Sequence, residues 1–153
     1  MIYKYLGNNT LKNIKIIHIV GPNNLDNSKK FKNYKQIEFI QDMTDFYSSI
    51  DLQISRAGGG VLEAVLINIP LLLIPYKHGT TSTHQSMNAE YLVKSKFAKL
   101  CANYESLEYE FKKLEQLDKS LFEEFSKNKV IKIGNDFIVN KIINEINKWV
   151  IKI

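Results

Sequence analysis

Short apolar runs alternate with amphipathic stretches through most of this chain, and this alternation limits the possible folds more than any other feature. Five runs have the length of strands: IKIIHIV (residues 14–20), QIEFI (36–40), DLQIS (51–55), LLLIP (71–75) and FAKLC (97–101). Helical stretches are expected between them, at residues 43–50, 61–67 and 83–94. Continuous apolar strands separated by helices indicate a parallel sheet that is covered by helices on both faces.

The boundaries and the end of the chain complete this prediction. Asp42 is placed to cap the helix that follows it, and Asn68 and Pro70 stop the next helix. From residue 104 onward the pattern is helical only, with two apolar stripes: Leu107, Phe111 and Leu114, then Phe137, Ile138, Ile142, Ile143, Ile146 and Val150. We therefore predict a single Rossmann-like α/β domain over residues 1–153, with helices on both faces of its sheet and C-terminal helices that close it.

The formal net charge of +5 comes almost entirely from lysines, which are scattered along the chain. A positive net charge favours binding to nucleic acid, to an anionic membrane surface or to a phosphorylated ligand. Arg56 is the only arginine, whereas proteins that read bases or clamp nucleic-acid phosphates usually use more. A solvated lysine surface is the simpler interpretation, and no nucleic-acid partner is expected.

Other features of the composition bear on location and cofactors. The single cysteine, Cys101, has no partner for an internal disulfide, which favours a reducing cytoplasm. No run approaches the ~18 apolar residues of a membrane span, and the first residues, MIYKYLGNNTLKN, are not expected to be a signal peptide. No metal-binding cluster is apparent in the sequence, so neither a metal nor another cofactor is expected.

The segment Ser55-Arg56-Ala57-Gly58-Gly59-Gly60 joins a predicted strand to a predicted helix. Glycines permit backbone angles and close approaches that a Cβ would forbid. A helix start presents free N–H groups, and ligands of open α/β sheets sit at the carboxyl ends of the strands. The loop is therefore a candidate pyrophosphate site, although a glycine-rich turn without a ligand explains this segment equally well when it is taken alone.

Glu63 lies within the first turns of the following helix, where a carboxylate can accept both hydroxyls of a ribose. An acidic residue that only stabilises the helix start is the simpler explanation for Glu63 alone. Further along, Gln85 and Asn88 stand three residues apart near the start of the helix at 83–94, so both amides project from one face. Amides donate and accept hydrogen bonds, which suits sugar hydroxyls.

The three histidines are weaker candidates. His84 is interpreted as a helix-start imidazole without chemistry, His78 similarly, and His18 as a hydrogen-bonded core residue. Taken together, the glycine turn, the carboxylate and the amide pair lie on consecutive loops at one edge of one predicted sheet. Their combination predicts a pocket for a nucleoside diphosphate that is linked to a polar group.

The run ISRAGGGVLEAVLINIPLLLIPYKHGTTSTHQSMNAEYL resembles the C-terminal half of the MurG glycosyltransferases, with S-R-A-G, L-x-E, I-P and H-Q-x-x-N-A elements in order. QIEFIQDM is similar to the F-I-x-x-M segment of that family. The resemblance covers roughly residues 14–100 well. It implies the donor-binding half of a GT-B fold and an inverting transfer of N-acetylglucosamine from UDP-N-acetylglucosamine to a lipid-linked peptidoglycan precursor.

The resemblance also implies roles for individual residues. Ile40 would lie against the uracil and bond it through its backbone, and Glu63 would take the ribose hydroxyls. Gln85 and Asn88 would hold the N-acetylglucosamine hydroxyls. Gly58, Gly59 and Gly60 would face the diphosphate and ribose, and Arg56 of the same turn is also implied at the substrate site. In this fold no metal is needed, because a helix end meets the negative charge of the ligand.

Two departures from the family are evident in the sequence. The spacing from Gly58 to Glu63 is one residue shorter than expected. The N-terminal acceptor domain and its general base are not found in this sequence, so the resemblance identifies no catalytic residue here and implies that activity needs an acceptor domain.

The resemblance implies that the complete enzyme acts at the cytoplasmic face of the membrane and that lysines make peripheral contact with its surface. A standalone donor subunit of a two-subunit lipid-linked N-acetylglucosaminyltransferase and a non-catalytic UDP-sugar-binding module are the alternatives.

Overall fold

The computed structural model describes residues 1–74, 82–116, 118, 120 and 123. The expected polar loop at 76–82, apart from the backbone of Ser82, and the apolar stripe between Phe137 and Val150 lie outside these residues. Helices and strands alternate in the order α1 (Ile2–Asn8), β1 (Ile16–Ile19), β2 (Tyr34–Ile37), α2 (Met43–Ser48), β3 (Gln53–Ser55), α3 (Val61–Leu66), β4 (Leu71–Leu73), α4 (Ser82–Lys94), β5 (Ala98–Leu100) and α5 (Tyr104–Glu115). The predicted α/β class is confirmed.

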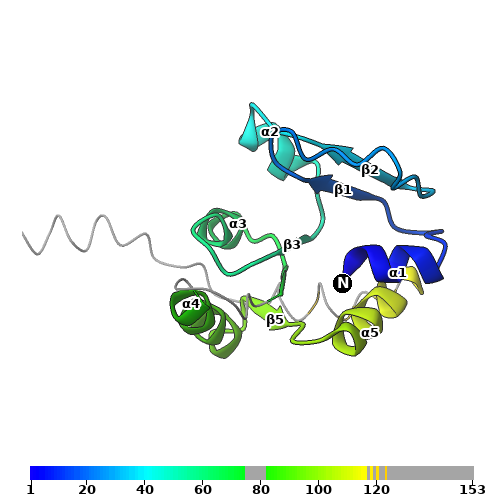
Figure 1. The fold of residues 1–153 in the computed structure, drawn as a ribbon. Helices are drawn as coiled ribbons and strands as arrows, with labels where there is room; N and C mark the ends of the chain where they lie inside the picture. Colours follow the sequence, from blue (N-terminus) through cyan, green and yellow to red (C-terminus); the bar gives the residue numbers. More distant parts are fainter. Residues whose placement is uncertain (75–81, 117, 119, 121–122, 124–153) are drawn as a thin grey trace, which may run out of the picture.

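All strand pairs are parallel, but they form two sheets rather than one. β1 pairs with β2, with Ile16 opposite Tyr34. In the second sheet β4 lies between β3 and β5, so that Leu71 is opposite both Gln53 and Ala98. Figure 1 shows the β1–β2 pair set apart from β3, and no backbone hydrogen bond joins β1 to β3 in the described part of the chain.

Helices cover both faces of the three-stranded sheet, as predicted. Leu71 and Leu73 belong to the apolar cluster formed with α3 and α4, whereas Leu72 belongs to the cluster formed with α1 and α5. All three leucines are fully buried. Because successive side chains of a strand point to opposite faces, this division places the two helix pairs on opposite sides of β4. Figure 1 shows α1 beside α5, where the rings of Tyr5 and Phe111 stack with centroids 4.6 Å apart.

The structure differs from the prediction at two elements. The second strand was placed at 36–40, but β2 occupies Tyr34–Ile37 and Phe39 beyond it is 71% exposed. Helix α1 was not predicted, because Gly7 and the asparagines after it make the segment a poor helix former. The helix is stabilised by tertiary packing, since Tyr5 and Leu6 are buried against α5.

The local signals for helix ends are confirmed. Both Thr44 and Asp45 donate their backbone N–H groups to the Asp42 side chain at the start of α2. Asn68 adopts a left-handed backbone with φ of 61° after α3, and the N–H of Ile69 then returns to the carbonyl of Ala64 at 2.8 Å. In the described part of the chain, no helix is both long and apolar enough to cross a bilayer.

Candidate functional site

The glycine turn lies between the end of β3 at Ser55 and the start of α3 at Val61. Gly59 and Gly60 are exposed, and a Cβ at any of the three glycines would meet no atom within 4 Å. None of them has a positive φ, so the turn does not use the left-handed backbone angles that glycine permits. What the glycines provide is an open surface over the backbone, on which a ligand can approach closely.

The backbone N–H groups of the turn divide into two sets. Gly58 donates to the carbonyl of Arg56 at 2.8 Å. Within the described residues, the N–H groups of Gly59 and Gly60 donate no hydrogen bond. Since α3 has only six residues, its dipole is small, and the N–H groups of the exposed residues Gly59 and Gly60 are the stronger feature for an anion.

Glu63 lies in the first turn of α3, and its side chain is exposed. The hydroxyl of Tyr47, at the end of α2, donates to Oε2 of Glu63 at 3.0 Å. The carbonyl oxygen of Gly60 lies 3.4 Å from the same hydroxyl. Oε1 of Glu63 makes no hydrogen bond to any residue that the structure describes. A residue of a second helix therefore holds one oxygen of the Glu63 carboxylate.

The amide pair lies on α4, a helix of 13 residues. Asn88 donates from Nδ2 to the carbonyl oxygen of Ala57 at 3.1 Å, which ties α4 to the glycine turn. Gln85 is half-buried, and its Oε1 is buried without a hydrogen-bond partner in the described structure. A buried amide oxygen without a donor is costly, so the fold leaves this acceptor of Gln85 unsatisfied.

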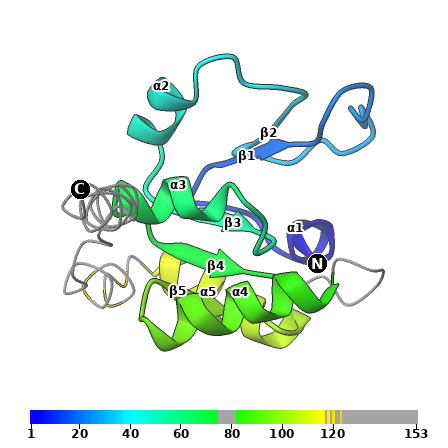
Figure 2. The same cartoon turned by 90° about the vertical axis from the view of Figure 1, so that its left-hand side faces the viewer.

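Asn88 of the amide pair therefore contacts the glycine turn. Figure 2 shows the start of α3 and the start of α4 at the same end of the three-stranded sheet. Ile40 is half-buried in the segment between β2 and α2, and Arg56 is an exposed residue of the turn itself. The ligand contacts expected of these residues stay predictions.

Two of the three histidines lie within the described residues. His84 is exposed on the first turn of α4, and His78 lies outside the described residues. Nδ1 of His18 is 2.8 Å from the hydroxyl of Tyr34. Burial lowers the pKa of His18, so the imidazole is a neutral packing residue on β1.

Sequence reasoning missed Tyr47 as a residue of the site. Its spacing from Glu63 along the chain carries no signal, because the contact joins two different helices.

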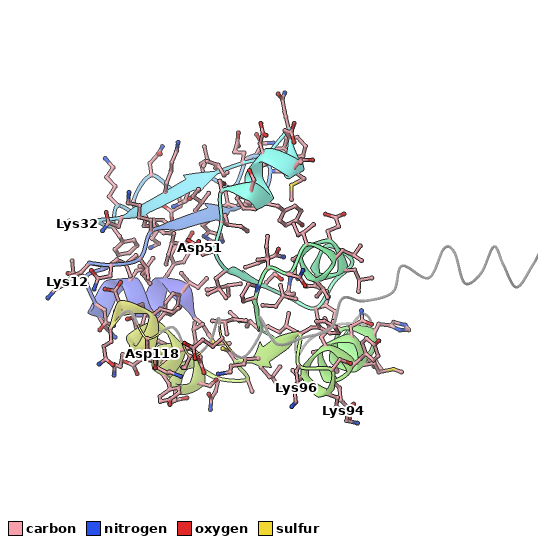
Figure 3. The ribbon with its side chains drawn as sticks, turned by 180° about the vertical axis from the view of Figure 1, so that it is seen from behind. Lys12, Lys32, Asp51, Lys94, Lys96 and Asp118 are labelled. Atoms are coloured by element: carbon pink, nitrogen blue, oxygen red, sulfur yellow. The ribbon has the colours of Figure 1, made fainter. Side chains whose placement is uncertain are left out.

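Lysines are spread over several elements, as the scattered pattern indicated; Figure 3 shows Lys12 and Lys32 well away from Lys94 and Lys96. In the described residues, no group of three or more histidine, cysteine or acidic side chains is placed to hold a metal ion.

The fold and the site together define a Rossmann-like α/β domain with a polar site on its strand-to-helix loops. Residues 2–144 match the family described as "Glycosyltransferase family 28 C-terminal domain". Because the match covers most of the chain, this chain belongs to the glycosyltransferase family 28 C-terminal domains.

Similar proteins agree with this assignment. A Clostridium perfringens (strain SM101 / Type A) protein named "UDP-N-acetylglucosamine--N-acetylmuramyl-(pentapeptide) pyrophosphoryl-undecaprenol N-acetylglucosamine transferase" is 33% identical over 145 residues, which is 92% of this chain and 40% of that protein. A Clostridium botulinum (strain Alaska E43 / Type E3) protein of the same name is 40% identical over 82 residues, covering 52% of this chain and 23% of its own length. The chain thus spans about two fifths of the length of the first of these relatives.

A solved structure shows the same fold. The crystal structure of Acinetobacter baumannii MurG superposes with a TM-score of 0.63 and 23% sequence identity, over 86% of this chain and 41% of that chain. The resemblance to the MurG family is therefore confirmed at the level of family and fold.

Proposed function

We propose that this chain binds UDP-N-acetylglucosamine and forms the donor-binding half of an inverting N-acetylglucosaminyltransferase of peptidoglycan lipid-precursor synthesis. The hydrogen bond from Asn88 to Ala57 carries the proposal, because it joins the glycine turn to the amide-bearing helix. Membership of family 28 and the name of the Clostridium perfringens relative support the choice of donor and pathway.

The donor would lie across the carboxyl ends of β3 and β4. The N–H groups of Gly59 and Gly60 would donate to the diphosphate, and Arg56 would add a positive charge at the turn. Glu63 would accept the ribose hydroxyls, and Ile40 would contact the uracil. The sugar would then lie near α4, where Gln85 offers its buried Oε1 and Asn88 keeps Oδ1 for a hydroxyl.

The reaction would displace UDP at the anomeric carbon of the sugar. A hydroxyl of the acceptor attacks that carbon from the side opposite the diphosphate, the bond from the carbon to the diphosphate oxygen breaks, and the configuration inverts. The attacking hydroxyl gives its proton to a general base, and UDP leaves with the electron pair. This chain would bind the leaving diphosphate through N–H groups that are already oriented, which lowers the cost of the developing charge.

The acceptor and the general base would come from an N-terminal acceptor domain, joined to this chain or associated with it. That domain would present an undecaprenyl-linked acceptor at the cytoplasmic face of the membrane. Surface lysines of this chain would favour peripheral contact with anionic lipid.

Calorimetry with UDP, UDP-N-acetylglucosamine and UDP-glucose tests the proposal directly. We expect UDP to bind, and we expect Gln85→Ala to weaken UDP-N-acetylglucosamine while leaving UDP almost unchanged. Glu63→Ala should weaken UDP itself. Gln116→Ala, an exposed glutamine at the end of α5, is the matched control and should change neither affinity.

Absence of heat with every uridine nucleotide would overturn the proposal. Tight UDP binding without any transfer after the acceptor domain is added would instead favour a non-catalytic UDP-sugar-binding module.

A further inference from the structure

The contact between Tyr47 and Glu63 joins the end of α2 to the first turn of α3. It consists of one hydrogen bond, from the phenol oxygen to Oε2 at 3.0 Å. The carbonyl of Gly60 is within reach of the same hydroxyl, at 3.4 Å. One phenol group therefore contacts both the glycine turn and the carboxylate that follows it.

Tyr47 is itself held in place. Its ring packs against the apolar cluster beneath α3 and α4, which includes the fully buried Ala57 and Ala64. Burial, followed by the hydrogen bond to Glu63, raises the pKa of Tyr47 to about 12. The phenol therefore keeps its proton at neutral pH and remains a donor to the carboxylate.

We infer that Tyr47 is a positioning residue for the ribose of the bound nucleotide, acting through Glu63. By occupying Oε2 it fixes the rotamer of an exposed side chain and leaves Oε1 for the ribose hydroxyls. A glutamate that is already oriented loses less conformational freedom when the ligand binds. This inference rests on the proposed function, because it needs a nucleotide whose ribose reaches Glu63.

A purely structural bond between α2 and α3 is the competing explanation. If Tyr47 only stabilised the fold, its loss would weaken every ligand of the site to the same extent. If Tyr47 acts through Glu63, its loss affects only ligands that carry ribose hydroxyls. The two explanations therefore differ in how the variant discriminates between UDP and its 2′,3′-dideoxy analogue.

The experiment is calorimetry of both nucleotides on the wild-type chain, Tyr47→Phe, Glu63→Ala and the double variant. Tyr47→Phe removes one hydroxyl and keeps the ring. We expect UDP affinity to fall about three- to tenfold, the range for the net contribution of one ordinary hydrogen bond, and we expect the affinity of the dideoxy analogue to stay the same. In the Glu63→Ala background, Tyr47→Phe should cause no further loss.

Tyr109→Phe is the matched control, because Tyr109 is an exposed tyrosine on α5. It should leave both affinities unchanged. Any loss of folded protein lowers binding of both nucleotides alike, so the ratio of the two affinities stays informative even for a destabilised variant.

The outcomes separate the two levels of the proposal. If the wild-type chain binds no uridine nucleotide, the proposed function fails. If it binds UDP better than the analogue, but Tyr47→Phe weakens both equally or neither, the positioning role is refuted and the proposed function stands. A wild-type chain that binds UDP and its analogue equally well refutes the contact of Glu63 with the ribose, and the positioning role with it.

Discussion

The structure gives Asn88 a role that differs from the role expected by family resemblance, and a variant can distinguish the two. Its Nδ2 donates to the carbonyl of Ala57 at 3.1 Å, so it anchors the glycine turn in addition to the sugar contact proposed for it. Asn88→Ala removes this anchor. We therefore expect the variant to weaken UDP and UDP-N-acetylglucosamine together, whereas a residue that touches only the sugar would spare UDP.

The size of the effect follows from the lost bond. A neutral hydrogen bond contributes about 1 kcal/mol net, which corresponds to about a fivefold loss of UDP affinity if the turn must be ordered before the diphosphate binds. Global stability should change less, because alanine is the better helix former by about half a kcal/mol and Asn88 lies inside α4. Weaker UDP binding would therefore not reflect unfolding.

Calorimetry with both nucleotides and a thermal melt of the same samples measure these quantities. Asn27→Ala, an exposed asparagine in the segment between β1 and β2, is the control and should behave as wild type. Unchanged UDP affinity together with weaker binding of UDP-N-acetylglucosamine would refute the anchoring role.

Two further predictions concern the scaffold. The side chain of Glu115 accepts backbone hydrogen bonds from Lys12, Asn13 and Ile14 at 3.0, 3.1 and 3.3 Å. In urea titrations, Glu115→Ala should therefore lower the free energy of unfolding by about 1–2 kcal/mol, and Glu115→Gln should lower it less. Equal stability of the wild type and both variants would contradict this prediction. Burial raises the pKa of the Cys101 thiol from 9.0 to about 11. The stability that comes from keeping this buried thiol protonated is therefore complete below pH 9 and is lost as the pH rises toward 11. Iodoacetamide should label the native thiol slowly at pH 8 and rapidly in urea, and rapid labelling of the folded chain would contradict the burial.

Much of the fold could be predicted from the sequence, because the relevant signals are local. The run of leucines at Leu71–Leu73 is apolar on both faces, which only a strand covered on both sides tolerates, and it became β4. The caps at Asp42 and Asn68 depend on side-chain and backbone chemistry within a few residues. The exception is α1, whose weak propensity is overcome by packing of Tyr5 on Phe111 more than a hundred residues later.

Some features of the candidate site could likewise be predicted from the sequence, and others could not. The glycine turn, Glu63 and the amide pair are recognisable as motifs, because the residue types and their order carry the signal. The division of the strands into two sheets was not predictable, since an apolar run does not specify which strand lies beside it. The same holds for the bond from Asn88 to Ala57 and for the one from Tyr47 to Glu63.

The sequence by itself therefore determined the class of fold, the family, and which residues are candidates for a donor nucleotide. Only the tertiary structure decided how those residues work together: that Asn88 holds the turn, that Gln85 has a buried acceptor without a donor, and that Tyr47 orients Glu63. The physical reason is that residue type sets which bonds a side chain is able to make, whereas its partner is set by the packing of helices that are distant in the chain.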